Sequence, residues 1–297
     1  RRTVHRALEL GINYIDTAPG YLNSEEVLGK CLERVTTPYY LSTKLGGRPQ
    51  PFNPRDKDGF FYSIEESLRL LKRDSVDILL IHEPDRPGQY DWWDSWDTFH
   101  GPVSDVLDAL KIRGLIRYTG LGGTTVYHLT RIIEKANYDV VLTAFNYSLF
   151  FREVGAYLIP AAKKKVMGVI AGSPLQQGWF AQRYDDVIRT DPPAWLAPQR
   201  AQQFIRLYEL SDREGLSVPE LAMRFVFSNP LIDTILTGSR SVQELEANVR
   251  AAEAGPLPAP LLEELDDIAA AVPFRPFEEP FGCPLRNKDY RGPGMAR

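Results

Sequence analysis

The chain has 297 residues, of which 43% are hydrophobic and 25% charged, with a net charge of -4. This composition is that of a globular protein, the charge excludes an overall basic field for nucleic acid or anionic lipid, and no apolar stretch is long enough to span a membrane. The two cysteines, Cys31 and Cys283, stand far apart in sequence and predict a reducing, cytoplasmic compartment.

Short apolar runs alternate with helical segments along the chain. The runs are apolar on both faces, which is typical of buried parallel strands, and they cover residues 12–16, 39–43, 77–82, 116–121, 139–145, 166–171 and 232–237. Between them, Ser63–Glu66 has the form of a capping box that opens a helix. Further helices are expected at 103–112, 129–135, 156–165, 204–214, 219–227, 242–252 and 261–271.

The alternation of strands and helices predicts a parallel sheet. It fits a barrel or an open doubly wound sheet, and the absence of an early G-x-G-x-x-G disfavours the open sheet. We therefore expect a (β/α)8 TIM barrel that lacks its first β-strand, because the chain begins without Met or a leading strand. The barrel is expected over residues 1–272. The Pro- and Gly-containing tail 273–297 is expected to drape over it or to be disordered.

Four polar residues stand at or just after three of the expected strands: Asp16, Tyr21, Lys44 and His82. Each alone fits a structural role, such as a cap or a packing residue. In a barrel, however, the carboxyl ends of successive strands are neighbours and build the active site. A Lys beside a Tyr favours the phenolate and lowers its pKa, an Asp keeps that Lys charged, and a His binds the substrate oxygen. The four together predict acid–base chemistry on a carbonyl or alcohol.

Several blocks resemble the aldo-keto reductase family: GINYIDTAPGY at 11–21, SEEVLG at 24–29, STK at 42–44, IH at 81–82, GLIR at 114–117 and GSR at 238–240. The resemblance runs in order over residues 4–271. It implies a nicotinamide-dependent barrel enzyme whose catalytic tetrad is Asp16, Tyr21, Lys44 and His82. Tyr21 would be the acid in reduction and the base in oxidation, while hydride passes directly between the nicotinamide and the substrate carbon.

Some positions depart from the family pattern. Gly122-Gly123 stands where the family usually has a Ser-Asn pair that holds the carboxamide, and the usual Gln and stacking aromatic are absent near Ala144 and Gly172. We expect the replacement contacts from Asn146, Ser173, Leu175 and Gln176. This Gly-rich version, with IHEPD at 81–85, is similar to the sugar-dehydrogenase branch, which oxidises the anomeric carbon of aldoses to a lactone.

The segment before the helix at 242 predicts the phosphate end of a cofactor site. Gly238 and Ser239 precede a helix N-terminus, where backbone N–H groups bind anions, and Arg240 suits a 2′-phosphate and so NADP. Glu244 would repel that phosphate and favours NAD, unless Arg240 and Glu244 simply form an exposed ion pair. Asn248 matches the adenine contact that the resemblance implies. The balance favours NAD over NADP.

The long segment 85–101 carries Trp92 and Trp93, which we expect to cover a sugar substrate together with Tyr147, unless the indoles only pack the loop onto the barrel. The four histidines lack ligand spacing, so no metal site is expected. The sequence thus predicts an aldose dehydrogenase acting on a small carbonyl or sugar substrate, without nucleic-acid or membrane partners, and leaves the oligomeric state open. The alternatives are an NADPH-dependent aldehyde or ketone reductase and a cofactor-binding regulatory protein with little turnover.

Overall fold

The computed structural model describes residues 1–86, 91–276, 279–288 and 290. Its strands form one sheet in chain order, and each lies where an apolar run predicted one: β1 (Tyr14–Asp16), β2 (Tyr40–Leu45), β3 (Val76–His82), β4 (Ile116–Gly123), β5 (Val140–Ala144), β6 (Gly168–Gly172) and β7 (Thr234–Leu236). The neighbours from β1 to β5 pair in parallel. The prediction of an α/β barrel of parallel strands is confirmed, with seven strands among the described residues.

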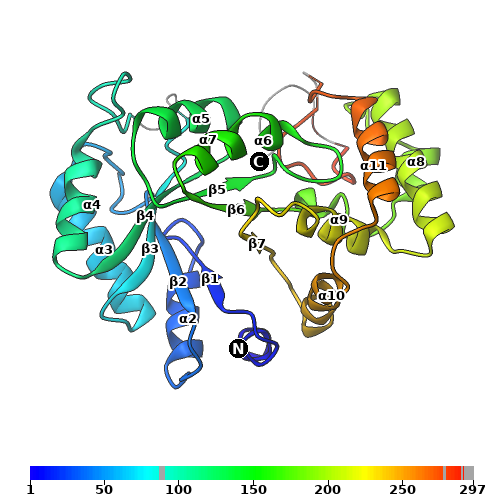
Figure 1. Ribbon diagram of the computed structural model, residues 1–297. Helices are drawn as coiled ribbons and strands as arrows, with labels where there is room; N and C mark the ends of the chain where they lie inside the picture. The colour runs from blue at the N-terminus through cyan, green and yellow to red at the C-terminus, as the bar shows by residue number, and fades with distance from the viewer. Residues whose placement is uncertain (87–90, 277–278, 289, 291–297) are drawn as a thin grey trace. The chain divides into compact units, whose positions relative to one another are not determined.

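Helices follow the strands along the chain (Figure 1). They are α1 (Arg2–Glu9), α2 (Ser24–Leu32), α3 (Lys57–Leu71), α4 (Pro102–Ile112), α5 (Val126–Lys135), α6 (Glu153–Ala156), α7 (Leu158–Lys164), α8 (Pro198–Glu214), α9 (Val218–Phe227), α10 (Val242–Glu253) and α11 (Ala259–Ala270), with the short helical turns η1 (Gln176–Gly178) and η2 (Asp186–Thr190). By contacts the chain divides into two compact units. The first holds residues 1–143, 157–170 and 239–245, and the second holds 144–156, 171–238 and 246–297.

The start of α3 differs from the prediction. The capping-box interpretation of Ser63–Glu66 was wrong, because the helix already begins at Lys57. Gly59 and Phe60 are buried one turn earlier, so the apolar stripe of the helix begins before Ser63. Ser63 lies in the helix interior, where its hydroxyl is buried without a hydrogen-bond partner among the described residues.

The core of the first unit is the apolar stretch of β3, in which Leu79, Leu80 and Ile81 are fully buried. Its neighbours are β2 and β4, in the registers Lys44↔Leu80 and His82↔Gly122. Because successive side chains of a strand point to opposite faces, Leu80 and His82 share one face of β3. The polar residue at the strand end is thereby carried on a rigid, buried element.

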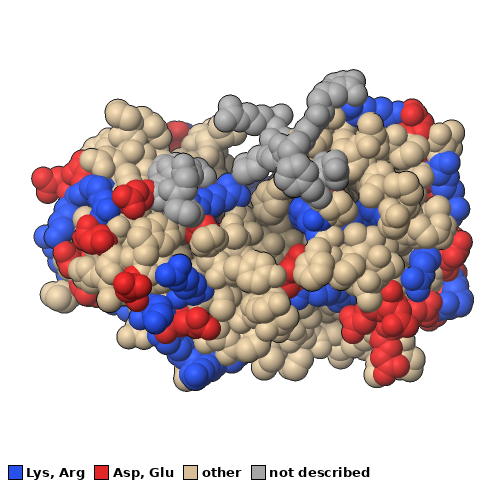
Figure 2. Space-filling view, turned by 90° about the horizontal axis from the view of Figure 1, so that it is seen from above, with Lys and Arg blue, Asp and Glu red and all other residues tan. Residues whose placement is uncertain are grey.

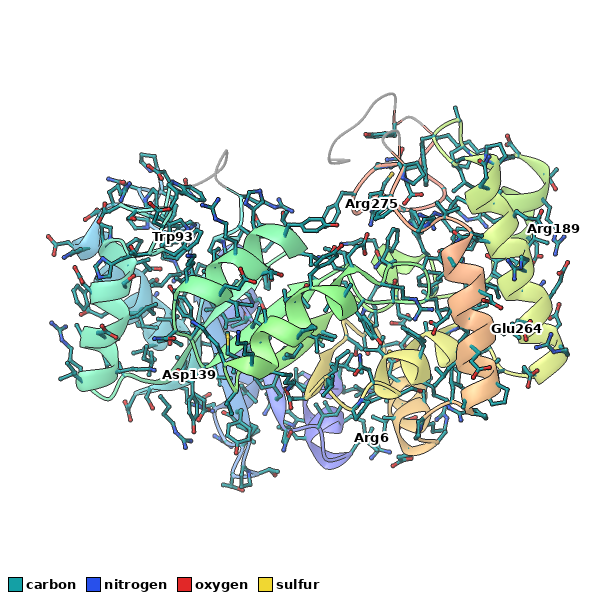
Figure 3. The ribbon with its side chains drawn as sticks, turned by 45° about the horizontal axis from the view of Figure 1, so that its top comes forward. Arg6, Trp93, Asp139, Arg189, Glu264 and Arg275 are labelled. Carbon is teal, nitrogen blue, oxygen red and sulfur yellow. The ribbon has the colours of Figure 1, made fainter. Side chains whose placement is uncertain are left out.

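The second unit has an aromatic core in which Trp179, Phe204 and Tyr208 are buried. The described part of the tail packs here: the indole of Trp179 donates to the carbonyl of Cys283 (2.6 Å), and Arg200 forms a fully buried ion pair with Glu279 (2.7 Å). Arg275, labelled in Figure 3, lies 4.0 Å from the ring of Phe151. Residues 277–278, 289 and 291–297 lie outside the described residues.

Charged side chains are spread over the surface. On the face seen in Figure 2, basic and acidic residues lie intermixed, with uncharged residues between them. Within the described residues, every helix is too short or too polar to cross a lipid bilayer.

Candidate active site

Three neighbouring strands of the first unit carry predicted catalytic residues at or next to their carboxyl ends. Asp16 is the last residue of β1 and pairs in register with Ser42 of β2. Lys44 lies two residues further along β2, on the same face as Ser42, and His82 ends β3. The parallel register therefore brings the three side chains to the carboxyl edge of the sheet, as the barrel prediction requires.

Asp16 and Lys44 form a buried ion pair. The Lys44 ammonium donates to Asp16 Oδ2 at 2.6 Å and to the carbonyl of Thr17 at 2.8 Å. The Lys44 side chain is 1% exposed and that of Asp16 is 10% exposed. Burial lowers the pKa of Lys44, and the charge and hydrogen bond of Asp16, followed by the charge of Glu25, oppose that shift. Asp16 is thus the main group that keeps this lysine charged.

Tyr21 lies above this pair. Its ring centroid is 4.7 Å from the Lys44 ammonium and 5.6 Å from the His82 ring, which it meets edge-on. Burial, followed by the charges of Asp16 and Glu83, raises the pKa of Tyr21. The lowering of this pKa by Lys44 that the sequence predicts is outweighed here by partial burial and the two carboxylates. Tyr21 is therefore a protonated phenol at neutral pH.

His82 completes the cluster as a neutral imidazole. Burial, then the charges of Lys44 and Arg86, lowers the pKa of His82 to about 3. A neutral ring can donate one hydrogen bond and accept another, so it can bind a substrate oxygen without competing with Tyr21 as the acid. The structure brings Asp16, Tyr21, Lys44 and His82 together in one unit, and their catalytic roles remain a proposal.

Gly46 is the first residue after β2, and its backbone lies close to His82. It has φ +134, a conformation open essentially to glycine, and a Cβ there would lie 3.0 Å from His82 Cβ and 3.7 Å from the Trp92 ring. Trp92 in turn packs on Phe60, with ring centroids 5.7 Å apart. A side chain at Gly46 would therefore push against His82 on one side and against the packed Trp92 on the other.

Gly46→Ala is expected to destabilise the protein by about 1–3 kcal/mol through backbone strain. It should also lower kcat about tenfold, because the added methyl group displaces His82. Urea unfolding and initial rates check both effects. Gly114→Ala is the matched control, since Gly114 also has positive φ but nothing within 4 Å of its Cβ position. An equal loss of kcat in both variants would refute the contact with His82.

Of the residues predicted to touch substrate, two are buried tryptophans and the third, Tyr147, lies in the second unit. Trp92 is 0% and Trp93 1% exposed, and Trp93 lies among packed side chains in Figure 3. This burial favours the alternative interpretation, in which the indoles pack their loop onto the barrel. Tyr147 lies in the second unit, where its hydroxyl accepts from Asn229 (2.9 Å). It lines a cavity of about 580 Å³ that contains no tetrad residue.

The Gly122-Gly123 pair has a local structural reason. Asp85 accepts hydrogen bonds from the backbone N–H groups of Thr124 (2.8 Å) and Thr125 just before α5. A Cβ at Gly123 would overlap the Asp85 carboxylate, so a larger residue there would have to displace Asp85 from its hydrogen bonds. Gly122 pairs with His82, and a Cβ on it would be in ordinary van der Waals contact with Leu80 (3.5 Å) and the carbonyl of Ile81 (3.7 Å).

The predicted carboxamide contacts lie in the second unit. Asn146 donates to the carbonyl of Ala144 (2.9 Å). The Gln176 amide donates to the carbonyl of Phe145 (2.5 Å) and to Ser148 Oγ (3.1 Å), so its nitrogen is committed to the protein. Ser173 has φ +57, and Leu175 packs against the aromatic core. Their contact with a cofactor stays a prediction.

Two hydrogen bonds between side chains and backbone hold the segment before α10. Glu244 Oε2 accepts from the backbone N–H of Arg240 (2.7 Å), while Ser241 Oγ accepts from the N–H of Glu244 (3.1 Å). The Glu244 carboxylate therefore binds the backbone of Arg240, at the place where Gly238, Ser239 and Arg240 were expected to meet phosphate. In the second unit the Asn248 amide donates to Thr237 Oγ1 (3.4 Å).

Sequence reasoning missed a second polar layer behind the tetrad. Glu25 of α2 is buried and accepts from Thr43 Oγ1 (2.7 Å) and from Arg48 (2.6 Å), and Ser42 donates to Asp16 Oδ1 (2.5 Å). The strand alternation could have placed Ser42 on the face of Lys44. Nothing in the sequence could have brought Arg48, in an irregular loop, to Glu25.

The chain matches a known protein family over most of its length. Residues 1–270 match the Aldo/keto reductase family. The chain is 30% identical over 266 residues to L-galactose dehydrogenase of Arabidopsis thaliana, covering 84% of this chain and 76% of the relative. It is 26% identical over 286 residues to D-threo-aldose 1-dehydrogenase of a Pseudomonas species, covering 87% and 84%.

Among solved structures, the holo form of aldo-keto reductase AKR11C1 from Bacillus halodurans superposes with a TM-score of 0.75 at 24% identity, covering 94% of this chain and 89% of that one. This likeness shows the barrel fold. The family match over residues 1–270 assigns the chain: this protein belongs to the aldo-keto reductase family of NAD(P)-dependent oxidoreductases.

Proposed function

We propose that this protein is an aldose dehydrogenase that oxidises the anomeric carbon of a sugar to a lactone and prefers NAD to NADP. The observation that carries the reaction class is the cluster of Asp16, Lys44, Tyr21 and His82, with Lys44 Nζ 2.6 Å from Asp16 and 4.7 Å from the Tyr21 ring. The names of two relatives, L-galactose dehydrogenase and D-threo-aldose 1-dehydrogenase, support the substrate class.

We propose two places in the first unit for the nicotinamide cofactor. Gly122 is buried and pairs with His82, and a Cβ there would already contact Leu80 and the carbonyl of Ile81, so its lack of a side chain is what would let a nicotinamide ring lie beside His82. At the turn 239–241 the Glu244 carboxylate accepts from the backbone N–H of Arg240, and a carboxylate at this place would repel a 2′-phosphate and so supports NAD over NADP. When bound, the nicotinamide supplies the hydride acceptor in oxidation and the donor in reduction.

In this proposal the chain's own residues move one proton and orient one oxygen. His82, a neutral imidazole, donates a hydrogen bond to the substrate oxygen and aligns it with Tyr21. In oxidation the hydroxyl of the sugar gives its proton to the Tyr21 phenolate while hydride leaves the anomeric carbon; in reduction the Tyr21 phenol gives its proton to the carbonyl oxygen. Lys44, held by Asp16, stabilises the phenolate in both directions.

Initial rates of nicotinamide reduction on a panel of aldoses, with NAD and NADP in parallel, test the proposal. We expect turnover of at least one aldose with a higher kcat/KM for NAD. Turnover of aldehydes but of no aldose would refute the aldose proposal in favour of an aldehyde or ketone reductase. Cofactor binding without any turnover would favour a regulatory protein.

One observation favours the second candidate, an aldehyde or ketone reductase. Because burial and the nearby carboxylates raise the pKa of Tyr21, the phenol is protonated at neutral pH and ready to act as the acid. Reduction therefore needs no prior ionisation, whereas oxidation needs the phenolate. The direction of catalysis is thus expected to depend on pH.

We expect the oxidation rate to rise about tenfold per pH unit through the alkaline range, since only the phenolate accepts a proton, while the reduction rate stays level around neutral pH. Initial rates measured in both directions from weakly acid to alkaline buffers check this result. A level oxidation rate over the same range would show that Tyr21 ionisation does not limit it.

A further inference from the structure

Ser42 is a fully buried hydroxyl residue of β2 in the interior of the first unit. It pairs in register with Asp16 on one side and with Ile78 on the other. A buried hydroxyl costs free energy unless it forms a hydrogen bond, and this hydroxyl donates to Asp16 Oδ1 at 2.5 Å. An alanine of similar size could not form this hydrogen bond.

The two oxygens of Asp16 are held by two different donors. Ser42 Oγ occupies Oδ1, and the Lys44 ammonium occupies Oδ2 at 2.6 Å. The backbone joins the same residues, because the carbonyl of Ser42 accepts from the N–H of Thr17 (3.0 Å) and the carbonyl of Thr17 accepts from Lys44 (2.8 Å). With both oxygens bound, the carboxylate cannot rotate freely about its side-chain torsion.

We propose that Ser42 is a positioning residue, whose hydroxyl holds the Asp16 carboxylate in the orientation that pairs it with Lys44. The role of the pair in catalysis rests on the proposed oxidoreductase function, whereas the orientation itself does not. Without the Ser42 hydrogen bond, Asp16 spends part of its time turned away from Lys44, and the buried ammonium loses its nearest opposite charge.

The charged and titratable groups of the cluster come from several elements. Asp16 of β1 and Glu25 of α2 act on Lys44 itself. Tyr14 of β1 lies near Asp16 and Ser42, Glu83 acts on Tyr21, Arg86 acts on His82, and Arg48 pairs with Glu25. Among these groups, Asp16 and Glu25 oppose the effect of burial on Lys44, with Asp16 first. Glu25 is bound to Thr43 and Arg48, so it cannot move to replace Asp16.

The direct test is the titration of the Lys44 ammonium by nitrogen NMR of lysine-labelled full-length protein, with Lys44→Met to assign the resonance. In Ser42→Ala we expect Lys44 to lose its proton about 0.5–1 pH unit lower than in the parent, because part of the charge support is lost. Ser42→Thr keeps the hydroxyl on a β-branched residue suited to a strand and should restore the parental value.

Ser63→Ala is the matched control, since Ser63 is also buried but its hydroxyl has no partner among the described residues. It should leave the Lys44 titration unchanged. An identical Lys44 titration in Ser42→Ala and the parent would overturn the proposal. So would a shift in Ser42→Thr as large as that in Ser42→Ala.

The kinetic consequence separates this inference from the proposed function. In Ser42→Ala the alkaline rise of the oxidation rate should move to higher pH by about 0.5–1 unit, because a less charged Lys44 stabilises the Tyr21 phenolate less. A merely structural role would lower kcat equally at every pH and would count against the proposal. A parent protein without turnover would refute the proposed function, while the NMR titration would still decide the role of Ser42.

Discussion

Tyr21→Phe is expected to lower kcat by about 100- to 10,000-fold, the range that a positioned proton donor contributes. The phenol lies edge-on to His82 and 4.7 Å from the Lys44 ammonium, so the variant removes one oxygen and leaves the ring contacts in place. Cofactor affinity, measured by fluorescence quenching, should change little. Initial rates in both directions check the loss.

Tyr62→Phe provides the control for this variant. Tyr62 is an exposed residue of α3, and the same loss of a hydroxyl there should leave kcat within about twofold, as surface substitutions usually do. If Tyr21→Phe kept most of its activity while binding cofactor normally, the proton would come from another group, and the assignment of Tyr21 as the acid and base would be wrong.

Lys44→Met should damage both stability and catalysis. It leaves the Asp16 carboxylate 10% exposed without its cation, and removing one partner of a buried ion pair costs about 3–5 kcal/mol. The loss of a fixed charge beside Tyr21 should lower kcat about 100- to 1,000-fold, the size found for removal of one preorganised electrostatic contact. Urea unfolding and initial rates on the folded fraction measure the two effects separately.

Lys57→Met is the matched comparison. Lys57 pairs with Asp105 at the same 2.6 Å distance, but the side chains are 51% and 48% exposed, so the expected cost is about 0–1 kcal/mol. Similar losses of stability in the two variants would contradict the view that burial gives the Asp16–Lys44 pair its importance. Normal kcat in folded Lys44→Met would remove Lys44 from the mechanism.

Much of the site was predictable because it depends on local pattern. Asp16, Lys44 and His82 each end an apolar strand, and parallel strands place such ends at one edge. The start of α3 was not predictable from Ser63 and Glu66, because the burial of Gly59 and Phe60 extends the helix by nearly two turns. The burial of Trp92 could not be predicted from the sequence either, since the same indole could cover a sugar or pack a loop onto the barrel.

The sequence by itself determined the strand order, the residues at the strand ends and the family, because strand periodicity and short motifs are properties of neighbouring residues. Tertiary structure alone decided the ionisation of the site: the raised pKa of Tyr21 and the lowered pKa of His82 arise from burial and from charges on other elements. It also decided that Asp85 excludes a side chain at Gly123 and that Ser42 faces Asp16. These features depend on distances between residues far apart in the chain, which only packing sets.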